Sequence, residues 1–264
     1  MNAARLELSA VVHRAEALAF LQSLPSASVD AVITDPPYSS GGFTRGDRTG
    51  DTTKKYVHTG AKIQRTDFQG DNRDQRSFHF WCALWLAEAL RVAKPGSPIA
   101  VFTDWRQLPI TTDAIQAGGW IWSGIVPWDK TEAVRPQMGR FAAQAEYVVW
   151  GSAGPMGDGT DVGCLPGAIR ARVALDDKFH ITGKPTAVMQ QLVRICPPGG
   201  VVLDPFAGSG STGVAALREG RSFIGCEIGE EYHAVARDRL AAELQQSTFE
   251  ALRSGQIPLL GGDT

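Results

Sequence analysis

The chain has 264 residues, of which 43% are hydrophobic and 20% are charged, and its formal net charge is −2. These values are typical of a globular protein, and the length fits one large domain over residues 1–264. No run approaches about 18 apolar residues and the N-terminus has no continuous apolar segment, so we expect neither a membrane span nor a signal peptide and predict a cytoplasmic protein.

The charges are unevenly distributed along the chain. Residues 39–76 hold eight Lys/Arg and five Asp, a balance of +3, whereas residues 227–264 hold three Arg and seven Asp/Glu, a balance of −4. A basic loop and an acidic tail are compatible with one phosphate-facing side and one solvated side. The four cysteines are scattered and form no C-x-x-C motif, which favours free thiols over disulfides or a zinc site, and we expect no metal.

The periodicity of apolar residues and the positions of Pro and Gly predict alternating strands and helices. The predicted strands cover residues 5–12, 28–34, 98–103, 120–128, 145–150, 201–203 and 221–226. The predicted helices cover residues 16–24, 77–93, 108–117, 186–195, 211–218 and 230–246. Such alternation is typical of an α/β fold, a mostly parallel twisted sheet with helices on both faces.

Two segments lack hydrophobic periodicity. Residues 39–76 combine six glycines with many charges, and a structureless segment of this length inside a domain is either functional or disordered. We expect a mobile loop that orders over the site on binding, and a disordered surface insertion is the alternative. Residues 151–168 hold six glycines and two prolines, and residues 151–178 form a short candidate insertion for target recognition.

The first candidate site follows the predicted strand that ends with Val32-Ile33-Thr34. Val, Ile and Thr favour a strand, and Pro36 and Pro37 must end it because neither can donate to a ladder. Asp35 therefore lies at the carboxyl end of the strand, the edge where open α/β sheets bind ligands. A carboxylate, a rigid Pro36 carbonyl and the Tyr38 ring together could hold a flat group that carries an amine. The alternative is a simple proline turn with Tyr38 in ordinary packing.

The second candidate site is the stretch from Asp204 to Gly213, which follows an apolar strand and opens a helix. Its glycines at 208, 210 and 213 allow close approach to a ligand, and Glu227, nineteen residues after Gly208, ends the next strand. A carboxylate there can accept both hydroxyls of a ribose, so an adenosine-containing cofactor is indicated. The Asp204 carboxylate suits a cation, such as the amino or sulfonium group of S-adenosylmethionine, better than a pyrophosphate.

These motifs together resemble the amino-group DNA methyltransferases. Asp35-Pro36-Pro37-Tyr38 is similar to the catalytic D-P-P-Y tetrapeptide, residues 204–210 to the F-x-G-x-G cofactor loop, and residues 180–185 to the H-x-T-x-K-P segment before it. The catalytic motif precedes the cofactor loop, as in the β class. The resemblance covers about residues 5 to 245 and implies a Rossmann-like S-adenosylmethionine-dependent methyltransferase fold.

The resemblance implies roles for individual residues. The catalytic set is Asp35, Pro36, Pro37 and Tyr38. The cofactor-binding set is Glu16, Asp35, His180, Thr182, Lys184, Asp204, Phe206, Gly208, Gly210 and Glu227. Glu16 departs from the family, which usually carries Gly-Asp where this chain has Ala15-Glu16. We expect Glu16 to replace that Asp near the cofactor adenine, and the alternative is a glutamate that merely favours a helix start.

The implied reaction is methylation of a flipped adenine at N6 in double-stranded DNA, with S-adenosylhomocysteine as the product. Asp at the head of the tetrapeptide favours adenine, and cytosine N4 is the near alternative. An NAD-linked oxidoreductase and a non-catalytic DNA-binding regulator are the alternatives from other classes. Target recognition is expected in residues 39–76 and 151–178, including Arg170, Arg172 and Lys178. The short recognition segment makes a homodimer plausible.

Overall fold

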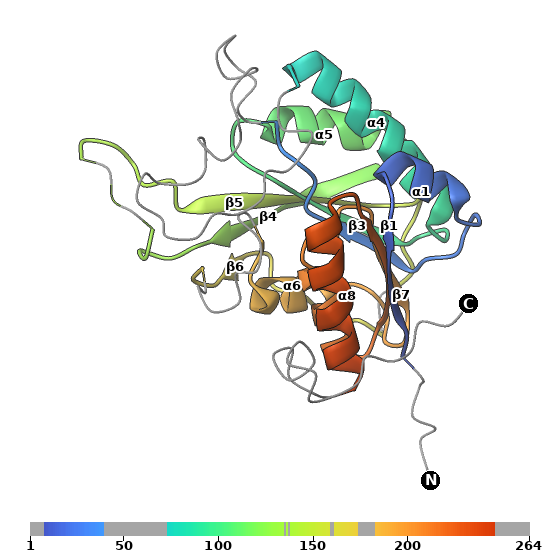
Figure 1. Ribbon diagram of the computed structural model, residues 1–264. Coiled ribbons are helices and arrows are strands. Elements are labelled where there is room, and N and C mark those ends of the chain that lie inside the picture. The colour runs from blue at the N-terminus through green and yellow to red at the C-terminus, as the bar shows by residue number, and fades with distance from the viewer. Residues whose placement is uncertain are drawn as a thin grey trace.

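The computed structural model describes residues 8–39, 73–134, 136, 138–158, 161–173 and 183–245. The centre of this described part is an eight-stranded sheet with the strand order β1-β8-β7-β2-β3-β5-β4-β6 (Figure 1). The strands are β1 (Ala10–Arg14), β2 (Ala31–Thr34), β3 (Pro98–Thr103), β4 (Ile121–Asp129), β5 (Ala145–Ser152), β6 (Ile169–Arg170), β7 (Val201–Asp204) and β8 (Ser222–Glu227).

Helices cover both faces of the sheet. They are α1 (Ala17–Ser23), α4 (Gln75–Val92), α5 (Leu108–Ala117), α6 (Thr186–Val193), α7 (Ser211–Arg218) and α8 (Glu230–Leu244). Figure 1 shows α1, α4 and α5 on one side of the strands and α6 and α8 on the other. None of the helices in the described ranges is both long and apolar enough to cross a membrane.

Successive side chains of the central strand β2 point to opposite faces of the sheet, and both faces are buried. Val32 belongs to the core cluster that contains Trp85 of α4 and Ile115 of α5. Its neighbour Ile33 belongs to the opposite cluster, with Met189 of α6 and residues of α7 and α8. All four residues of β2 are buried, so the apolar run that predicted this strand is explained by helices on both sides.

The predicted mostly parallel sheet is confirmed, with one antiparallel strand. β5 runs antiparallel to both of its neighbours, β3 and β4, with Val149 opposite Val101 on one side and Ile125 on the other. The carboxyl ends of the parallel strands thus meet at one edge, and β5 begins at that same edge. Residues at the start of β5 are therefore brought next to Asp35.

Every predicted helix and strand is present, but many of their ends lie one to three residues from the predicted positions. The strand predicted at 5–12 is observed as β1, Ala10–Arg14, because its pairing with β8 aligns Arg14 with Glu227. The helix predicted to start at 77 starts at Gln75, where the Asp74 carboxylate accepts hydrogen bonds from the next amides. The two-residue strand β6 was not predicted because it is too short to show a pattern. Residues 40–72 of the predicted loop lie outside the described residues.

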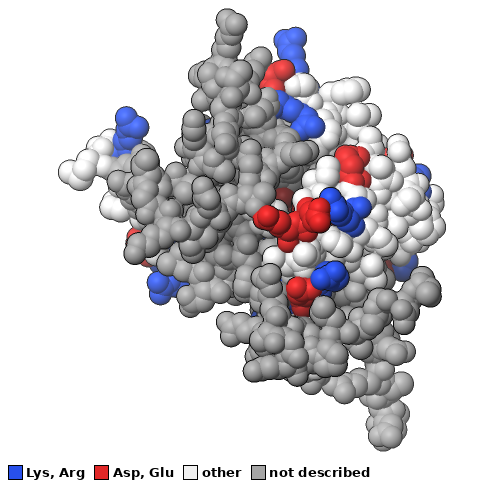
Figure 2. Space-filling model, in the orientation of Figure 1, with Lys and Arg blue, Asp and Glu red and all other residues white. Residues whose placement is uncertain are grey.

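The face that carries α8 has mixed charge. Figure 2 shows Lys and Arg beside Asp and Glu among the coloured residues of this face. Ion pairs account for part of this pattern, with Arg14 at 2.9 Å from Glu230 and Arg218 at 2.9 Å from Glu243. Among the described residues of this face, the charges therefore form no patch of one sign.

Candidate active site

Two loops at the carboxyl edge of the sheet carry most of the predicted site residues. Asp35 follows β2, and the glycine loop follows β7, which pairs with β2 through Val32 and Leu203. Glu227 ends β8, which pairs with β7 on its other side. The register therefore places the D-P-P-Y segment, the glycine loop and Glu227 side by side. Their order in the sequence did not show that they are neighbours.

Both oxygens of the Asp35 carboxylate are engaged. Tyr38 Oη donates to Asp35 Oδ1 at 2.7 Å, and Lys184 Nζ lies 2.7 Å from Asp35 Oδ2. The Lys184 side chain is 6% exposed and that of Asp35 is 20% exposed, so this ion pair is largely shielded from water. Lys184 is thus the immediate partner of the predicted catalytic carboxylate.

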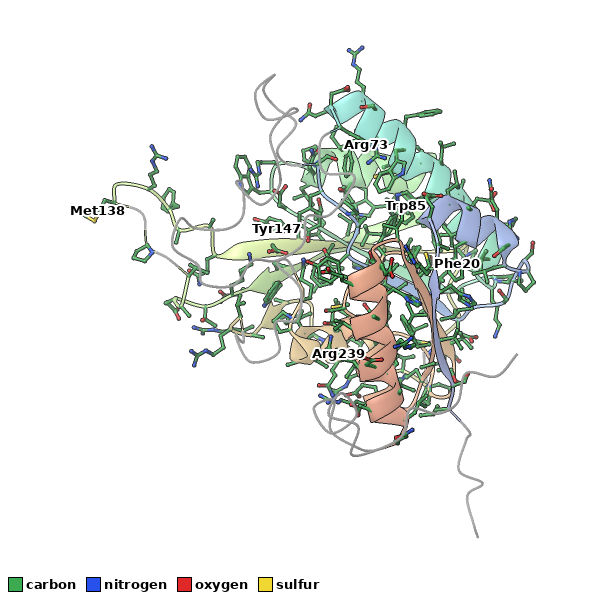
Figure 3. All side chains as sticks on the ribbon, in the orientation of Figure 1. Phe20, Arg73, Trp85, Met138, Tyr147 and Arg239 are labelled. Atoms are coloured by element: carbon green, nitrogen blue, oxygen red, sulfur yellow. The ribbon has the colours of Figure 1, made fainter. Side chains whose placement is uncertain are left out.

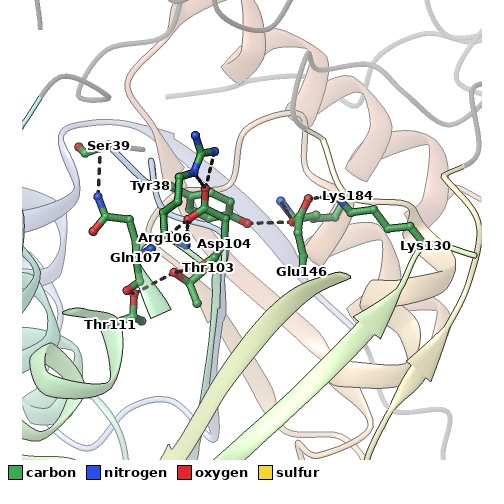
Figure 4. A network of polar contacts seen from close by, with 10 residues as sticks. All are labelled: Tyr38, Ser39, Thr103, Asp104, Arg106, Gln107, Thr111, Lys130, Glu146 and Lys184. Atoms are coloured by element: carbon green, nitrogen blue, oxygen red, sulfur yellow. Dashed lines mark hydrogen bonds and ion pairs between the residues drawn. The ribbon is translucent and has the colours of Figure 1, made fainter. Parts of the chain in front are cut away.

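A second carboxylate, Glu146 of β5, contacts the same two donors (Figure 4). Glu146 Oε2 lies 3.2 Å from Tyr38 Oη and 3.2 Å from Lys184 Nζ. Its other oxygen, Oε1, lies 2.5 Å from Nζ of Lys130, which follows β4. Two lysines and two carboxylates therefore balance in charge around the Tyr38 hydroxyl, a network that the sequence did not predict.

The network separates the acidities of the two carboxylates. Burial raises the pKa of Asp35, the nearby Glu146 charge raises it further, and Lys184 only partly opposes them. Burial also acts to raise the pKa of Glu146, but Lys184 and Lys130 outweigh it and the pKa falls to about 2. The two carboxylates raise the pKa of Lys184 although burial acts to lower it. Glu146 is therefore firmly ionised, whereas Asp35 binds a proton more readily than an ordinary aspartate.

The Lys184 ammonium also lies against two aromatic rings. It is 5.1 Å from the ring centroid of Tyr38 and 5.0 Å from that of Phe102 of β3. Contacts of this kind are favourable for a desolvated cation. They orient the Tyr38 ring beside Asp35, so the ring and the carboxylate are held as one unit.

The chain leaves Tyr38 through a constrained turn. Ser39 is fully buried and has a positive φ of 52°, which is uncommon for a residue with a side chain. Its carbonyl accepts a hydrogen bond from Nε2 of the buried Gln107 at 3.2 Å (Figure 4). The side chain of Asp104, which follows β3, in turn accepts a hydrogen bond from the backbone amide of Gln107 at 3.0 Å. The loop after β3 therefore fixes the backbone that follows the D-P-P-Y segment.

Asp204 is buried within its own loop. Its Oδ1 accepts from Thr34 Oγ1 at 2.6 Å and from the Phe206 amide at 3.0 Å, and its Oδ2 accepts from Thr212 Oγ1 at 2.5 Å. Burial raises its pKa to about 6. These contacts make Asp204 the residue that shapes the glycine loop and joins it to β2. A direct contact with a bound cation stays a prediction.

The glycines of the loop meet two structural requirements. Gly208 and Gly210 have positive φ values of 51° and 83°, which favour glycine. A Cβ at Gly210 would lie 3.1 Å from Cβ of Ala236 on α8. Arg239, one turn further along α8 and buried, donates to the Ser209 carbonyl at 2.7 Å (Figure 3). The loop is thus held against α8 in one conformation.

Glu227 stands beside this loop. Its Oε2 accepts from the Gly208 amide at 2.9 Å, and its Oε1 accepts from the Gly229 amide at 2.7 Å. Burial raises its pKa, and these backbone donors oppose that effect. Each carboxylate oxygen has a second lone pair, so Glu227 can still accept the two hydroxyls of a ribose.

Glu16 follows β1 at the same edge as Glu227. Its Oε2 accepts from the Ala19 amide at 3.0 Å and caps α1, the helix-start role that was kept as an alternative. The Ala15 amide donates to the Glu227 backbone carbonyl at 3.2 Å, which places Glu16 next to the predicted ribose acceptor. Both roles are compatible with this position, and adenine contact stays a prediction.

Phe206 packs edge-on against two tryptophans of α4. Its ring centroid is 5.5 Å from that of Trp81 and 5.2 Å from that of Trp85. Trp85 is buried, whereas Trp81 is half-buried and lies 4.4 Å under the guanidinium of Arg73. An aromatic wall therefore borders the glycine loop on the α4 side.

Other predicted residues are placed only in part. His180, Thr182 and Lys178 lie outside the described residues. Arg170 is exposed and pairs with Glu132 at 3.0 Å, a contact between β6 and the segment after β4. Nothing in these contacts assigns Arg170 to DNA, so its recognition role stays a prediction.

The sequence is similar to those of known proteins. It matches the DNA methylase family N6_N4_Mtase over residues 29–157 and 166–238. The chain belongs to this family. Among curated relatives, the YubD protein of Escherichia coli (strain K12) is 29% identical over 223 residues, 84% of this chain and 86% of the relative. The type II methyltransferase M2.DpnII of Streptococcus pneumoniae is 27% identical over 246 residues, 85% of this chain and 87% of the relative.

Solved structures share the fold of this DNA methylase. The M1.HpyAVI–SAM complex superposes with a TM-score of 0.63 at 23% identity, covering 88% of this chain and 98% of that one. The cytosine-N4-specific PvuII DNA methyltransferase gives a TM-score of 0.65 at 18% identity, covering 90% and 93%. The predicted family and the predicted methyltransferase fold are therefore confirmed.

Proposed function

We propose that this DNA methylase transfers a methyl group from S-adenosylmethionine to the exocyclic N6 of a flipped adenine in double-stranded DNA. The observation that carries the proposal is the position of Asp35, a partly desolvated carboxylate at a strand tip beside a glycine loop and a ribose-type acceptor. Asp204 joins the two halves through Thr34 at 2.6 Å, so their separation is fixed. A fixed separation is what transfer between two bound molecules requires.

The residues at the glycine loop fit an adenosine cofactor. The positive φ at Gly208 and Gly210 keeps Cβ atoms away from the loop surface, and Glu227 presents carboxylate oxygens beside it. By the family resemblance, three further residues would border the cofactor: Phe206, Lys184 and Glu16. S-adenosylmethionine supplies an electrophilic methyl group when it is bound.

The catalytic work of the chain lies at Asp35 and Pro36. The exocyclic nitrogen is a poor nucleophile because its lone pair is delocalised into the ring. Asp35 and the Pro36 carbonyl each accept one of its N–H bonds, which turns the lone pair out of the ring plane. This is positioning combined with electrostatic stabilisation of the positive charge that develops on nitrogen. The methylated amine then loses a proton to Asp35 or water.

The target base must leave the duplex to reach Asp35. Base flipping costs a few kcal/mol, and stacking on an aromatic ring such as Tyr38 returns roughly 1–3 kcal/mol. Contacts to phosphates and bases are assigned to residues 39–76 and 151–178. A homodimer, a cytoplasmic location and a place in a restriction-modification system belong to the same proposal as expectations.

Adenine is preferred because the tetrapeptide begins with Asp. Cytosine N4 is the second candidate, since the PvuII enzyme of the same fold is cytosine-N4-specific. Mass spectrometry of nucleosides, after DNA is incubated with the protein and S-adenosylmethionine, distinguishes these outcomes. N6-methyladenine supports the proposal, and N4-methylcytosine replaces it by the second candidate. The absence of both methylated bases leaves a non-catalytic DNA-binding regulator, and binding of NAD in place of S-adenosylmethionine indicates an oxidoreductase.

A further inference from the structure

The two groups that hold Asp35 share a second acceptor. Tyr38 Oη lies 2.7 Å from Asp35 Oδ1 and 3.2 Å from Glu146 Oε2. Lys184 Nζ shows the same preference, at 2.7 Å from Asp35 Oδ2 and 3.2 Å from Glu146 Oε2. One oxygen of Glu146 is therefore the alternative partner of both donors.

The hydrogen bonds around Asp35 conflict with the proposed reaction. The exocyclic amine must donate to Asp35, whose oxygens each keep a second lone pair, but Tyr38 already draws on the charge of Oδ1 and Lys184 on that of Oδ2, which weakens both as acceptors. Tyr38 carries a single hydroxyl proton, so it cannot donate fully to two carboxylates at once. If Tyr38 kept donating this proton to Asp35, its hydrogen bond would compete with the one from the amine of the target base.

We propose that Glu146 is a positioning residue that takes over the Tyr38 hydroxyl when the target amine occupies Asp35 Oδ1. The inference rests on the proposed function, because it concerns the same amine and the same carboxylate. The hydroxyl proton rotates from one acceptor to the other, and no covalent bond is made or broken. Lys184 stays in contact with both carboxylates, so its charge is neutralised throughout.

Glu146 is held firmly enough for this role. Its Oε1 is fixed by Lys130 at 2.5 Å, which leaves Oε2 directed to Tyr38 and Lys184. Its backbone lies in β5, where Glu146 is opposite Trp128 of β4 and the next residue, Tyr147, is also opposite Thr103 of β3. A side chain on a doubly paired strand is positioned more precisely than one on a loop.

The transfer of the hydrogen bond leaves the Tyr38 ring in place. The ring stays near Lys184, with its centroid 5.1 Å from Nζ, while only the direction of the O–H bond changes. Without Glu146, the Tyr38 hydroxyl would either keep donating to Asp35 or become a donor without a partner, which is unfavourable when the group is buried. Glu146 therefore frees Asp35 and keeps the stacking surface fixed.

A double-mutant cycle on the single-turnover rate of methyl transfer tests the proposal. An amide oxygen is a weaker acceptor than a carboxylate. Glu146→Gln should therefore lower the rate about tenfold, while affinity for S-adenosylmethionine by calorimetry changes less than about twofold. In the Tyr38→Phe background the same change should have almost no further effect, since the hydroxyl is absent. Equal losses in both backgrounds, or a wild-type rate for Glu146→Gln, would overturn it.

The matched control is Glu219→Gln. Glu219 has a similarly buried side chain, 15% against 17% exposed, and pairs with Arg194 far from the site, at the end of α7. This control should transfer methyl groups at the wild-type rate and should show any general cost of removing a paired glutamate. A rate loss as large as that of Glu146→Gln would contradict a specific role.

A second measurement is independent of methyl transfer. The ring carbon that bears the hydroxyl is labelled in all four tyrosines, and Tyr38 is assigned with Tyr38→Phe. In Asp35→Asn the Tyr38 signal should keep the shift of a hydrogen-bonded phenol, because Glu146 accepts the proton. In Asp35→Asn/Glu146→Gln it should move toward free tyrosine. The same shift in both variants would refute the transfer, even if the wild-type protein methylates no base.

Discussion

The Thr34 hydroxyl donates to Asp204 Oδ1 at 2.6 Å across 170 residues of sequence. Thr34 is the last residue of β2, directly before Asp35, and Asp204 is the last residue of β7, directly before the glycine loop. One buried hydrogen bond thus connects the segment expected to position the amine with the segment expected to hold the methyl donor. Movement of either loop relative to the other must strain this bond.

Thr34→Val should therefore destabilise the protein by about 1–3 kcal/mol. The substitution keeps the side-chain volume nearly constant, but it leaves Oδ1 of the buried Asp204 with the Phe206 amide as its remaining donor. Urea unfolding measures the change. The control is Thr112→Val on α5, whose exposed hydroxyl bonds only to its own helix through the Pro109 carbonyl at 2.8 Å. We expect less than about 0.5 kcal/mol there. Equal effects of the two substitutions would contradict a linking role for Thr34.

The raised pKa of Asp204 predicts a pH dependence of stability. The pKa of about 6 in the folded protein exceeds the ordinary aspartate value of 3.8, so between these pH values the folded state binds more protons than the unfolded state. The contribution of Asp204 to the free energy of unfolding should thus fall as pH rises from about 4 to about 6, by at most about 3 kcal/mol.

Urea unfolding of the wild-type protein and Asp204→Asn across pH 4 to 7 isolates this contribution. The difference between their free energies of unfolding should decrease as the pH rises through the folded pKa of about 6, and it should level off only toward about pH 7. A difference that rises with pH would mean that hydrogen bonds from Thr34 and Thr212 outweigh burial. The side chain would then have a lowered pKa.

The sequence predicted the residues whose role is encoded locally. Asp35 is marked by the prolines after it, and Glu227 by its distance from Gly208. Glu146 and Lys130 were missed because their proximity to Asp35 depends on the antiparallel return of β5 beside β3. The sequence around Glu146, at the start of an apolar strand, does not show which groups this side chain will face. Only the strand order brings it within 3.2 Å of Tyr38, 108 residues away.

The direction of a strand-end carboxylate was the second feature that the sequence could not give. Asp204 ends β7 and Asp35 directly follows β2, and both were expected to face a ligand. In the structure Asp204 turns inward, where Thr34 and Thr212 provide hydroxyl donors, whereas Asp35 faces Tyr38 and Lys184. The difference depends on which donors the neighbouring strand and the following helix present. These become neighbours only after folding.

Asp35→Ala should lower methyl transfer by about 100- to 1,000-fold, the usual cost of removing one group that stabilises developing charge. Cofactor affinity should change little, because we expect the cofactor to bind mainly at Gly208, Gly210 and Glu227. Single-turnover transfer of radiolabelled methyl groups and calorimetry with S-adenosylmethionine measure the two effects. Substantial turnover by this variant would refute the role assigned to Asp35.

Gly210→Ala should weaken both folding and cofactor binding. The new Cβ would lie 3.1 Å from Cβ of Ala236, and the residue would keep a φ of 83°, which costs about 1–2 kcal/mol for a side-chain residue. Gly154→Ala is the matched control, since Gly154 has a φ of 87° but a Cβ there meets nothing within 4 Å. The control should show the backbone cost alone by urea unfolding and unchanged calorimetric affinity for S-adenosylmethionine. If both variants lose stability equally and bind the cofactor as the wild type does, close packing of the loop on α8 is not what shapes the cofactor site.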